Sequence, residues 1–191
     1  MKTSLRTGFA ALLGFVLLAL TAWGQAATLT PADRLLDHIE QATYVAEGHG
    51  PRLLYVFFDP NCPYCHSLYQ NLRPWVGKGG LQVRWIPVGI LTSSSEPKAA
   101  AILQAPSPLV ALRKNEDDFG FSDDAGGGIA PASRIGAKAQ QELAANSALM
   151  QSQRIYGVPV LLYRDRSGRG QLLVGGPASP AELRALLDRI K

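Results

Sequence analysis

The apolar residues of this chain fall into short runs that are typical of buried strands. Residues 53–58 form an unbroken apolar run, and residues 81–88 alternate, with Val83 and Trp85 on one face. Two further runs, at 160–163 and 171–174, flank a turn-forming stretch. The pattern predicts two strands that are separated by a long connection from a hairpin near the C-terminus.

Helix-forming segments fill the remaining positions. Thr30 followed by Pro31 is typical of a helix start, and Ser179 with Glu182 has the spacing of a capping box. The predicted helices cover residues 30–46, 63–75, 95–103, 108–118 and 137–153, followed by a last helix that Ser179 opens.

The order of these elements is β-α-β, a helical insertion, and then β-β-α. A strand, a helix and a second strand in this order predict a right-handed parallel unit, and hence an α/β fold. We expect an N-terminal helix and linker at 27–51 and one domain at 52–191, with the insertion at about 92–153. Within the insertion, residues 120–136 contain three consecutive glycines and are predicted to be a long, mobile or functional loop.

The first 26 residues have the character of a signal peptide rather than of the fold. Lys2 and Arg6 precede an apolar stretch at 8–23, and small residues at 24–26 suit signal peptidase. We expect cleavage after Ala26, with Ala27 as the alternative site and an uncleaved anchor as the alternative fate. Export to the periplasm would place the cysteines in an oxidising compartment.

The composition is that of an ordinary globular protein, with 47% hydrophobic residues and a formal net charge of +4. Part of that charge lies in the signal peptide, and the basic residues are scattered, which argues against a nucleic-acid partner. The one local cluster, Arg164, Arg166 and Arg169, surrounds Asp165 and Gly168 and is interpreted as a hairpin turn with a solvated face.

The two cysteines of the chain, Cys62 and Cys65, follow the first buried strand. The turn-forming residues 59–61 end that strand, and Pro63 suits the first turn of a helix. Cys62 would then face unpaired N–H groups, which stabilise a thiolate and lower its pKa. We predict that Cys62 is the exposed nucleophile and that Cys65, further inside, is the resolving thiol.

The cysteine pair also allows three other interpretations. A zinc site would need His66, His38 or His49 as additional ligands, and a structural disulfide across so short a loop would stabilise little. The pattern Cys62-x-x-Cys65-His66 also matches covalent attachment of c-type haem, for which Met150 is the available distal ligand.

The element order, the Cys-x-x-Cys pair after the first strand and the proline before the third resemble the thioredoxin fold. The resemblance implies that Pro159 is cis and lies beside Cys62, where the backbone of Val158 would hold an extended partner peptide. Glutaredoxins share the Cys-Pro-Tyr-Cys sequence, Val158-Pro159 and Gly175-Gly176, but they are smaller and depend on intracellular glutathione.

Several stretches are similar to the catalytic domain of the periplasmic DsbG/DsbC family of thiol:disulfide interchange proteins. They are residues 57–66, Arg-Pro-Trp-Val at 73–76, Val-Gly at 88–89 and Lys-Ala-Ala-Ala-Ile-Leu at 98–103. The resemblance implies disulfide reductase or isomerase activity on exported client proteins with disulfides or oxidised cysteines. It also implies reduction by a DsbD-like membrane reductase and no bound cofactor.

Two departures from that family set limits. The family has a separate N-terminal dimerisation domain, which the residues before Arg52 are too few to form, so we expect a monomer. The family has threonine before the proline, whereas Val158 is the residue found in DsbA-like oxidases. A DsbA-like dithiol oxidase is therefore the alternative function, and a binding module with idle cysteines is another.

Smaller signals concern residues next to the cysteines. His66 is predicted either to stabilise the Cys62 thiolate or to be a surface residue, and Asp59 either to help proton transfer or to serve the turn. Tyr64 would shape the surface that meets the partner. Related proteins place a buried acid at the position of Val56, so a proton acceptor for Cys65 must come from elsewhere.

Overall fold

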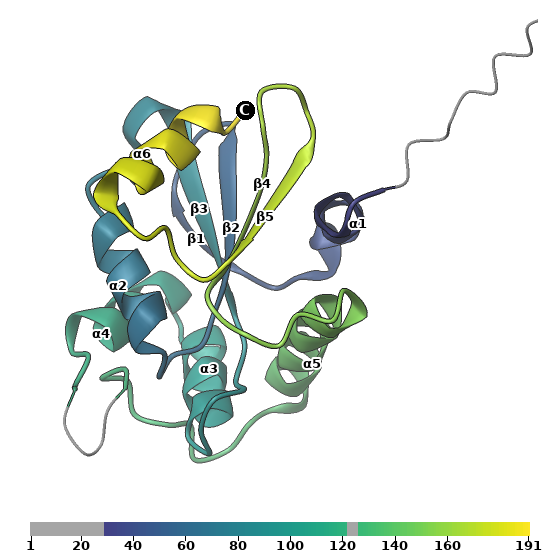
Figure 1. The fold of residues 1–191 in the computed structure, drawn as a ribbon. Helices are drawn as coiled ribbons and strands as arrows, with labels where there is room; N and C mark the ends of the chain where they lie inside the picture. The colour runs from purple at the N-terminus through teal and green to yellow at the C-terminus, as the bar shows by residue number, and fades with distance from the viewer. Residues whose placement is uncertain (1–28, 122–125) are drawn as a thin grey trace, which may run out of the picture.

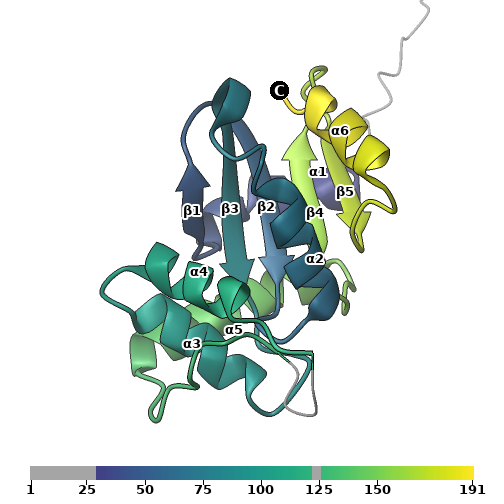
Figure 2. The same cartoon turned by 90° about the vertical axis from the view of Figure 1, so that its left-hand side faces the viewer.

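The computed structural model describes residues 29–121 and 126–191; the predicted signal peptide lies outside this range. Its strands form one five-stranded mixed sheet in the order β1-β3-β2-β4-β5 (Figure 2). Only β2 and β3 are parallel, and the other neighbours are antiparallel. The strands are β1 (Val45–Gly48), β2 (Arg52–Phe58), β3 (Leu81–Pro87), β4 (Val160–Arg164) and β5 (Gly170–Val174).

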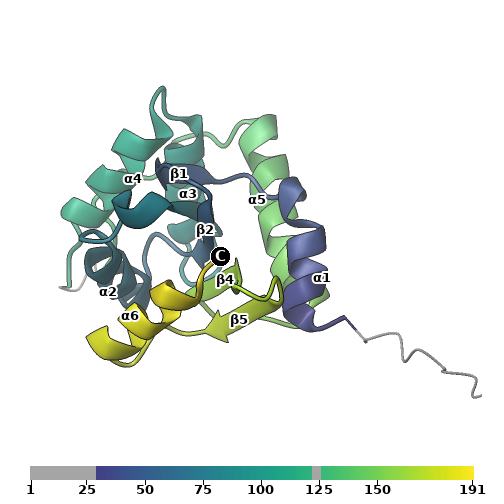
Figure 3. The same ribbon diagram turned by 90° about the horizontal axis from the view of Figure 1, so that it is seen from above.

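Helices cover both faces of the sheet (Figure 1). Seen from above, α2 and α6 lie on one side and α1 and α5 on the other (Figure 3). The helices are α1 (Pro31–Asp37), α2 (Pro63–Leu72), α3 (Ser95–Gln104), α4 (Pro108–Asp117), α5 (Ala137–Ser152) and α6 (Pro180–Arg189).

The central strand β2 explains this layered arrangement. Its side chains alternate, so that Val56 and Phe58 pack towards α2 while Tyr55 and Phe57 pack towards α1 and α5. Burying each such side chain contributes about 1.5–3 kcal/mol. A strand that is apolar on both faces is therefore stable only between two helical layers. The predicted α/β class is confirmed, and from β2 onward the elements follow the predicted order.

The predicted helix at 30–46 is wrong in its second half. Helix α1 ends at Asp37, a single 3₁₀ turn follows, and Val45–Gly48 forms the edge strand β1. The side-chain amide of Asn146 in α5 accepts a hydrogen bond from Thr43 N and donates one to Thr43 O, both of 2.9 Å. These contacts hold the backbone before β1 in an extended conformation. The residues near Thr43 in the sequence do not predict them.

Helix α2 also ends earlier than predicted, at Leu72 rather than near Trp75. The early end agrees with the expectation that Pro74 does not fit a helix interior.

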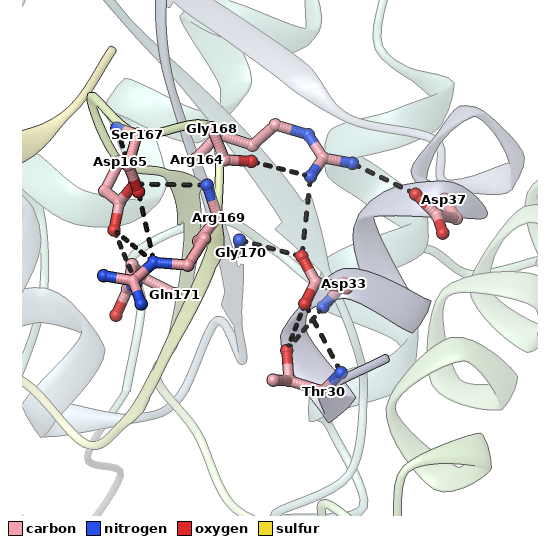
Figure 4. A network of polar contacts seen from close by, with 10 residues as sticks. All are labelled: Thr30, Asp33, Asp37, Arg164, Asp165, Ser167, Gly168, Arg169, Gly170 and Gln171. Atoms are coloured by element: carbon pink, nitrogen blue, oxygen red, sulfur yellow. Dashed lines mark hydrogen bonds and ion pairs between the residues drawn. The ribbon is translucent and has the colours of Figure 1, made fainter. Parts of the chain in front are cut away.

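One arginine of the β4–β5 hairpin, Arg164, does more than face solvent (Figure 4). Arg164 reaches α1, where it lies 3.0 Å from Asp37 and 3.6 Å from Asp33. Asp33 also accepts hydrogen bonds from the backbone N–H of Gly170 and from Thr30. The carboxylate of Asp33 therefore caps α1 and joins it to the hairpin.

Within residues 29–121 and 126–191, we find no helix with the length and apolar character needed to cross a membrane.

Replacing Asp33 should test this junction. Hydrogen bonds from Thr30 and then Gly170 lower the pKa of Asp33. Its contribution to stability is therefore complete above about pH 4 and is lost as the pH falls through the lower folded-state value. We expect Asp33→Asn to reduce the free energy of unfolding by about 1 kcal/mol at neutral pH, allowing for solvent screening.

The measurement is urea denaturation at neutral pH and at about pH 2. The difference between wild type and Asp33→Asn should shrink in acid. Asp37→Asn is the control, because Asp37 contacts the hairpin through an exposed ion pair and its loss should cost less than about 0.5 kcal/mol. The role given to Asp33 would be contradicted if both substitutions changed the free energy of unfolding equally. It would also be contradicted if the difference between wild type and Asp33→Asn were the same in acid as at neutral pH.

Candidate active site

The two cysteines lie where β2 ends and α2 begins. Cys62 is the N-cap residue of α2, and its sulfur accepts a hydrogen bond of 3.3 Å from the backbone N–H of Cys65. Pro63 occupies the first helical position, where its missing N–H costs nothing. The N-terminal N–H groups of α2 are thus directed at the Cys62 sulfur, as the spacing of the motif predicts.

The surroundings separate the pKa values of the two thiols. A hydrogen bond from the Cys65 thiol, followed by the backbone N–H groups of Cys65 and Tyr64, lowers the pKa of Cys62 to about 7. Burial and the negative charge of Asp59 oppose this effect. The pKa of Cys65 is raised, first by burial and then by the Cys62 sulfur. Near neutral pH, Cys62 therefore holds the thiolate and Cys65 the proton.

Cys62 is less accessible than predicted. Its exposed fraction is 2%, close to the 1% of Cys65, and both belong to the core beneath α2. The expected contrast between an exposed and an inner thiol is therefore wrong for solvent exposure, although it holds for the pKa.

The Val158–Pro159 peptide bond is cis and lies beside Cys62. The Cys62 sulfur lies 3.8 Å from the carbonyl oxygen of Val158, to which it donates a long hydrogen bond when Cys62 is protonated. On the other side, Pro159 O accepts a hydrogen bond of 2.8 Å from the N–H of Gly175. The fold thus brings Val158 and Pro159 beside Cys62, although Val158 lies 96 residues further along the chain.

Asp59 holds the turn before Cys62 in place. Its buried carboxylate accepts four hydrogen bonds: from Asn61 N, from Ser95 Oγ, and from the backbone N–H groups of Ile90 and Leu91, at 2.7–3.0 Å. These contacts tie the turn to the start of α3. The carboxylate raises the pKa of Cys62, so Asp59 anchors the loop and works against the thiolate.

The sequence did not predict the polar contacts of Asn61, the last residue of this turn. Asn61 donates to the hydroxyls of Thr92 and Ser94 and accepts a 2.8 Å hydrogen bond from Lys98. Lys98 also donates to the carbonyl of Gly127. Lys98 lies within the family-like stretch 98–103, but nothing in the sequence alone pairs it with Asn61.

Part of the glycine-rich segment, which was expected to be loose, is docked against this turn. Gly127 N donates to Pro60 O, and Gly128 N donates to Asn115 O, both at 2.9 Å. A Cβ atom at Gly127 would lie 1.8 Å from the side-chain oxygen of Asn115. Glycine is required here because the backbone approaches another side chain too closely for any larger residue.

The ring of His66 contacts two residues of the helical insertion. Its Nδ1 lies 3.2 Å from Oε2 of Glu116, and its ring stacks on Phe119 with centroids 4.5 Å apart. Burial lowers the pKa of His66. Neither predicted role, thiolate partner or surface residue, describes it. Glu116 was not predicted either, since in the sequence it resembles any charged residue at a helix end.

Tyr64, in contrast, is 74% exposed beside Cys62. It borders a shallow pocket of about 270 Å³ that extends to Leu68, Leu183 and the segment 176–179.

The metal and haem interpretations find little support in this geometry. Among the described residues, no group of three or more His, Cys, Asp or Glu side chains is arranged to hold a metal ion. Met150, the one candidate distal haem ligand, is buried in the core on the opposite face of the sheet from Cys62. His66 already contacts Glu116 and Phe119.

A sheet flanked by helices, with a Cys-x-x-Cys pair at a helix N-terminus beside a cis-proline, defines the thioredoxin-fold class. A family model for the thioredoxin-like domain matches residues 39–191. The chain belongs to this thioredoxin-like domain family.

Relatives with a named activity are also found. The chain is 36% identical over 158 residues to the thiol:disulfide interchange protein DsbG of Pseudomonas aeruginosa. The matched region covers 82% of this chain and 59% of that protein. It is 31% identical over 150 residues to DsbG of Escherichia coli, covering 77% and 58%. The chain thus spans less than two thirds of these relatives.

Among solved structures, a periplasmic thioredoxin-like protein from Salmonella enterica serovar Typhimurium has a similar fold. Its TM-score is 0.59 at 22% identity, over 83% of this chain and 90% of that one.

The hydrogen bond between the two thiols can be tested with a matched pair of variants. Cys65→Ala removes the donor and should raise the pKa of Cys62 above its wild-type value of about 7. Cys65→Ser keeps an O–H donor and should leave the pKa close to wild type. In both variants Cys62 is the one remaining thiol, so thiolate absorbance in the ultraviolet reports on it directly. An equal shift in the two variants would contradict the role given to the Cys65 thiol.

Proposed function

We propose that this protein is a periplasmic thiol–disulfide oxidoreductase, a disulfide reductase or isomerase of the DsbG/DsbC type. The observation that carries the proposal is the unequal pair of thiols at the N-terminus of α2. Cys62 has a pKa of about 7 and lies beside cis-Pro159, whereas burial raises the pKa of Cys65. A thiolate next to a protonated thiol is the reactant that disulfide exchange needs.

The reaction proceeds through a mixed disulfide. The Cys62 thiolate attacks one sulfur of a client disulfide, forming a Cys62–client bond and releasing the other client sulfur as a thiolate, which takes up a proton. Cys65 then loses its proton and attacks the Cys62 sulfur. This forms the Cys62–Cys65 disulfide and releases the client cysteine, which has gained electrons. For isomerisation, a second client cysteine attacks instead and Cys62 leaves as a thiolate.

Residues around Cys62 have chemistry suited to an extended client segment. The backbone of Val158 precedes cis-Pro159 and already contacts the Cys62 sulfur, so it is placed to pair with a client backbone. The exposed ring of Tyr64 offers apolar area on the other side. Because both thiols are covered in this state, a client must displace some of that cover before it reacts.

The direction of electron flow decides between two candidate functions. The DsbG relatives support thiol–disulfide interchange. We infer that this chain works as a reductase or isomerase on exported proteins and that a DsbD-like membrane reductase reduces it. Val158 supports the second candidate, a DsbA-like oxidase, because valine lacks the hydroxyl that threonine would offer there. A monomeric state, a periplasmic location after removal of residues 1–26, no bound cofactor and no nucleic-acid partner complete the proposal.

Substitution of each cysteine tests the exchange reaction. Cys62→Ser should reduce a disulfide-containing model protein no faster than a protein-free control, because the attacking thiolate is gone. Cys65→Ser should instead accumulate the mixed disulfide with the client, visible on a non-reducing gel and by mass. Retained function in Cys62→Ser would favour a binding module with idle cysteines, and a coloured protein with covalent haem would favour the haem interpretation.

The redox state of the pair in the cell tests the direction. Acid trapping followed by thiol alkylation should find Cys62 and Cys65 mostly reduced, since a dedicated donor must hold a reductase or isomerase in that state in an oxidising compartment. Deleting the membrane reductase should shift the pair to the disulfide. A mostly oxidised pair in wild-type cells would contradict the reductase proposal and favour the oxidase.

A further inference from the structure

A buried acid from the helical insertion lies against the cysteine helix, and the exchange steps above leave it without a role. Glu116, near the end of α4, is 2% exposed. Its Oε1 accepts a hydrogen bond of 3.0 Å from Asn115 Nδ2, and its Oε2 lies 3.2 Å from His66 Nδ1. Asn115 Nδ2 also donates to Pro60 O, in the turn before Cys62. The carboxyl group thus contacts the residue after Cys65 and, through Asn115, the turn before Cys62.

Glu116 differs from the charged groups around it in lacking a fixed positive partner among its hydrogen-bond contacts in the described residues. Glu47 in β1, also buried, pairs with Arg113 at 3.0 Å, and Asp117 pairs with Arg73 at 2.7 Å. Glu116 contacts an amide and an imidazole instead. Keeping a buried acid without a cation has a cost in stability, so its presence beside a reactive pair is a functional indication.

The charge of Glu116 is linked to the state of the cysteines. Burial is the main cause that raises the pKa of Glu116 to about 8, and negative charge on Cys62, Asp117 and Glu47 adds to it. Conversely, negative charge on Glu116 raises the pKa of Cys65, after burial and the Cys62 sulfur. Burial lowers the pKa of His66, so near neutral pH Glu116 holds the proton and donates it to His66 Nδ1.

We propose that Glu116 is the group that accepts the proton of Cys65 when Cys65 resolves the mixed disulfide, an inference that rests on the proposed exchange function. Formation of the mixed disulfide removes the negative charge of Cys62. Glu116 then releases its proton towards solvent along His66, whose side chain is 14% exposed. The resulting carboxylate takes the proton from the Cys65 thiol, and the Cys65 thiolate forms the bond to the Cys62 sulfur as the client thiolate leaves.

The contacts of Glu116 define how the proton travels. Both carboxyl oxygens are engaged by Asn115 and His66 rather than by a sulfur atom. The proposed transfer from the Cys65 thiol to this carboxyl therefore runs through a bridging water, a route that general acid–base catalysis allows. Glu116 thus acts through a relay, and the pH dependence of the resolving step is its signature.

The test follows the two exchange steps separately. Reduced protein is mixed with dithiobis(nitrobenzoate), an aromatic disulfide. Attack by Cys62 releases one coloured thiolate, and resolution by Cys65 releases the second. In wild type, the rate of the second phase should rise with pH and reach a plateau as Glu116 ionises. In Glu116→Gln, the second phase should be about 100-fold slower at neutral pH and should rise without a plateau, while the first phase changes little.

Asp117→Asn is the matched control. This substitution removes the exposed charge next to Glu116 and leaves the buried Glu116 carboxyl in place. Both phases of the reaction should therefore persist, and the rate of the second phase should still reach a plateau with rising pH. A second phase in Glu116→Gln with wild-type rate and pH profile would overturn the assignment while leaving the exchange function intact. The absence of a first phase in wild type would instead overturn the proposed function.

A second measurement does not depend on the folding of Glu116→Gln. In Cys65→Ser at neutral pH, conversion of the Cys62 thiolate to its mixed disulfide with the same aromatic thiol should ionise Glu116. An infrared difference spectrum should then show the loss of a protonated-carboxyl band. An unchanged carboxyl region would overturn the proposal.

Discussion

The buried carboxylate of Asp59 is the contact on which the geometry of the site depends. A charge removed from water must be compensated, and here hydrogen bonds from the turn itself and from the start of α3 do so. The cap of α2, the direction of its N–H groups and the position of Cys62 all follow from that turn. The same negative charge raises the pKa of Cys62, so the N–H groups and the Cys65 thiol must outweigh it to hold the thiolate.

The helical insertion is a structural part of the site. Helix α3 contributes Ser95 and Lys98 beneath the turn, and α4 contributes Asn115 and Glu116 beside α2. The segment at 126–128 joins the turn before Cys62 to α4 through backbone hydrogen bonds to Pro60 and Asn115. The thioredoxin-like sheet places the cysteines, and the insertion supplies most of the polar surroundings that support and tune them.

These surroundings distribute two tasks between different residues. The thiolate of Cys62 is stabilised locally, by groups within one turn of α2. Loss of the proton from Cys65 involves a more distant group, because burial makes Cys65 a poor acid and its neighbours in the motif offer no base. His66, which the sequence places next to the pair, joins the second task through Glu116 rather than the first.

The sequence by itself determined the features that depend on neighbouring residues. The apolar run of β2, the proline and cysteine at the start of α2, and the capping of α1 and α6 involve contacts within a few positions. The pairing of the cysteines with cis-Pro159 came from resemblance to a family, since nothing local in Val158-Pro159 specifies it. The tertiary structure alone decided β1, the docking of Gly127 and the contact between His66 and Glu116. Each depends on a buried polar group whose partner lies far along the chain, as Thr43 and Asn146 do at a separation of 103 residues. Such partners are chosen by the need to satisfy hydrogen bonds in the interior, and that need arises only once the sheet and helices have packed.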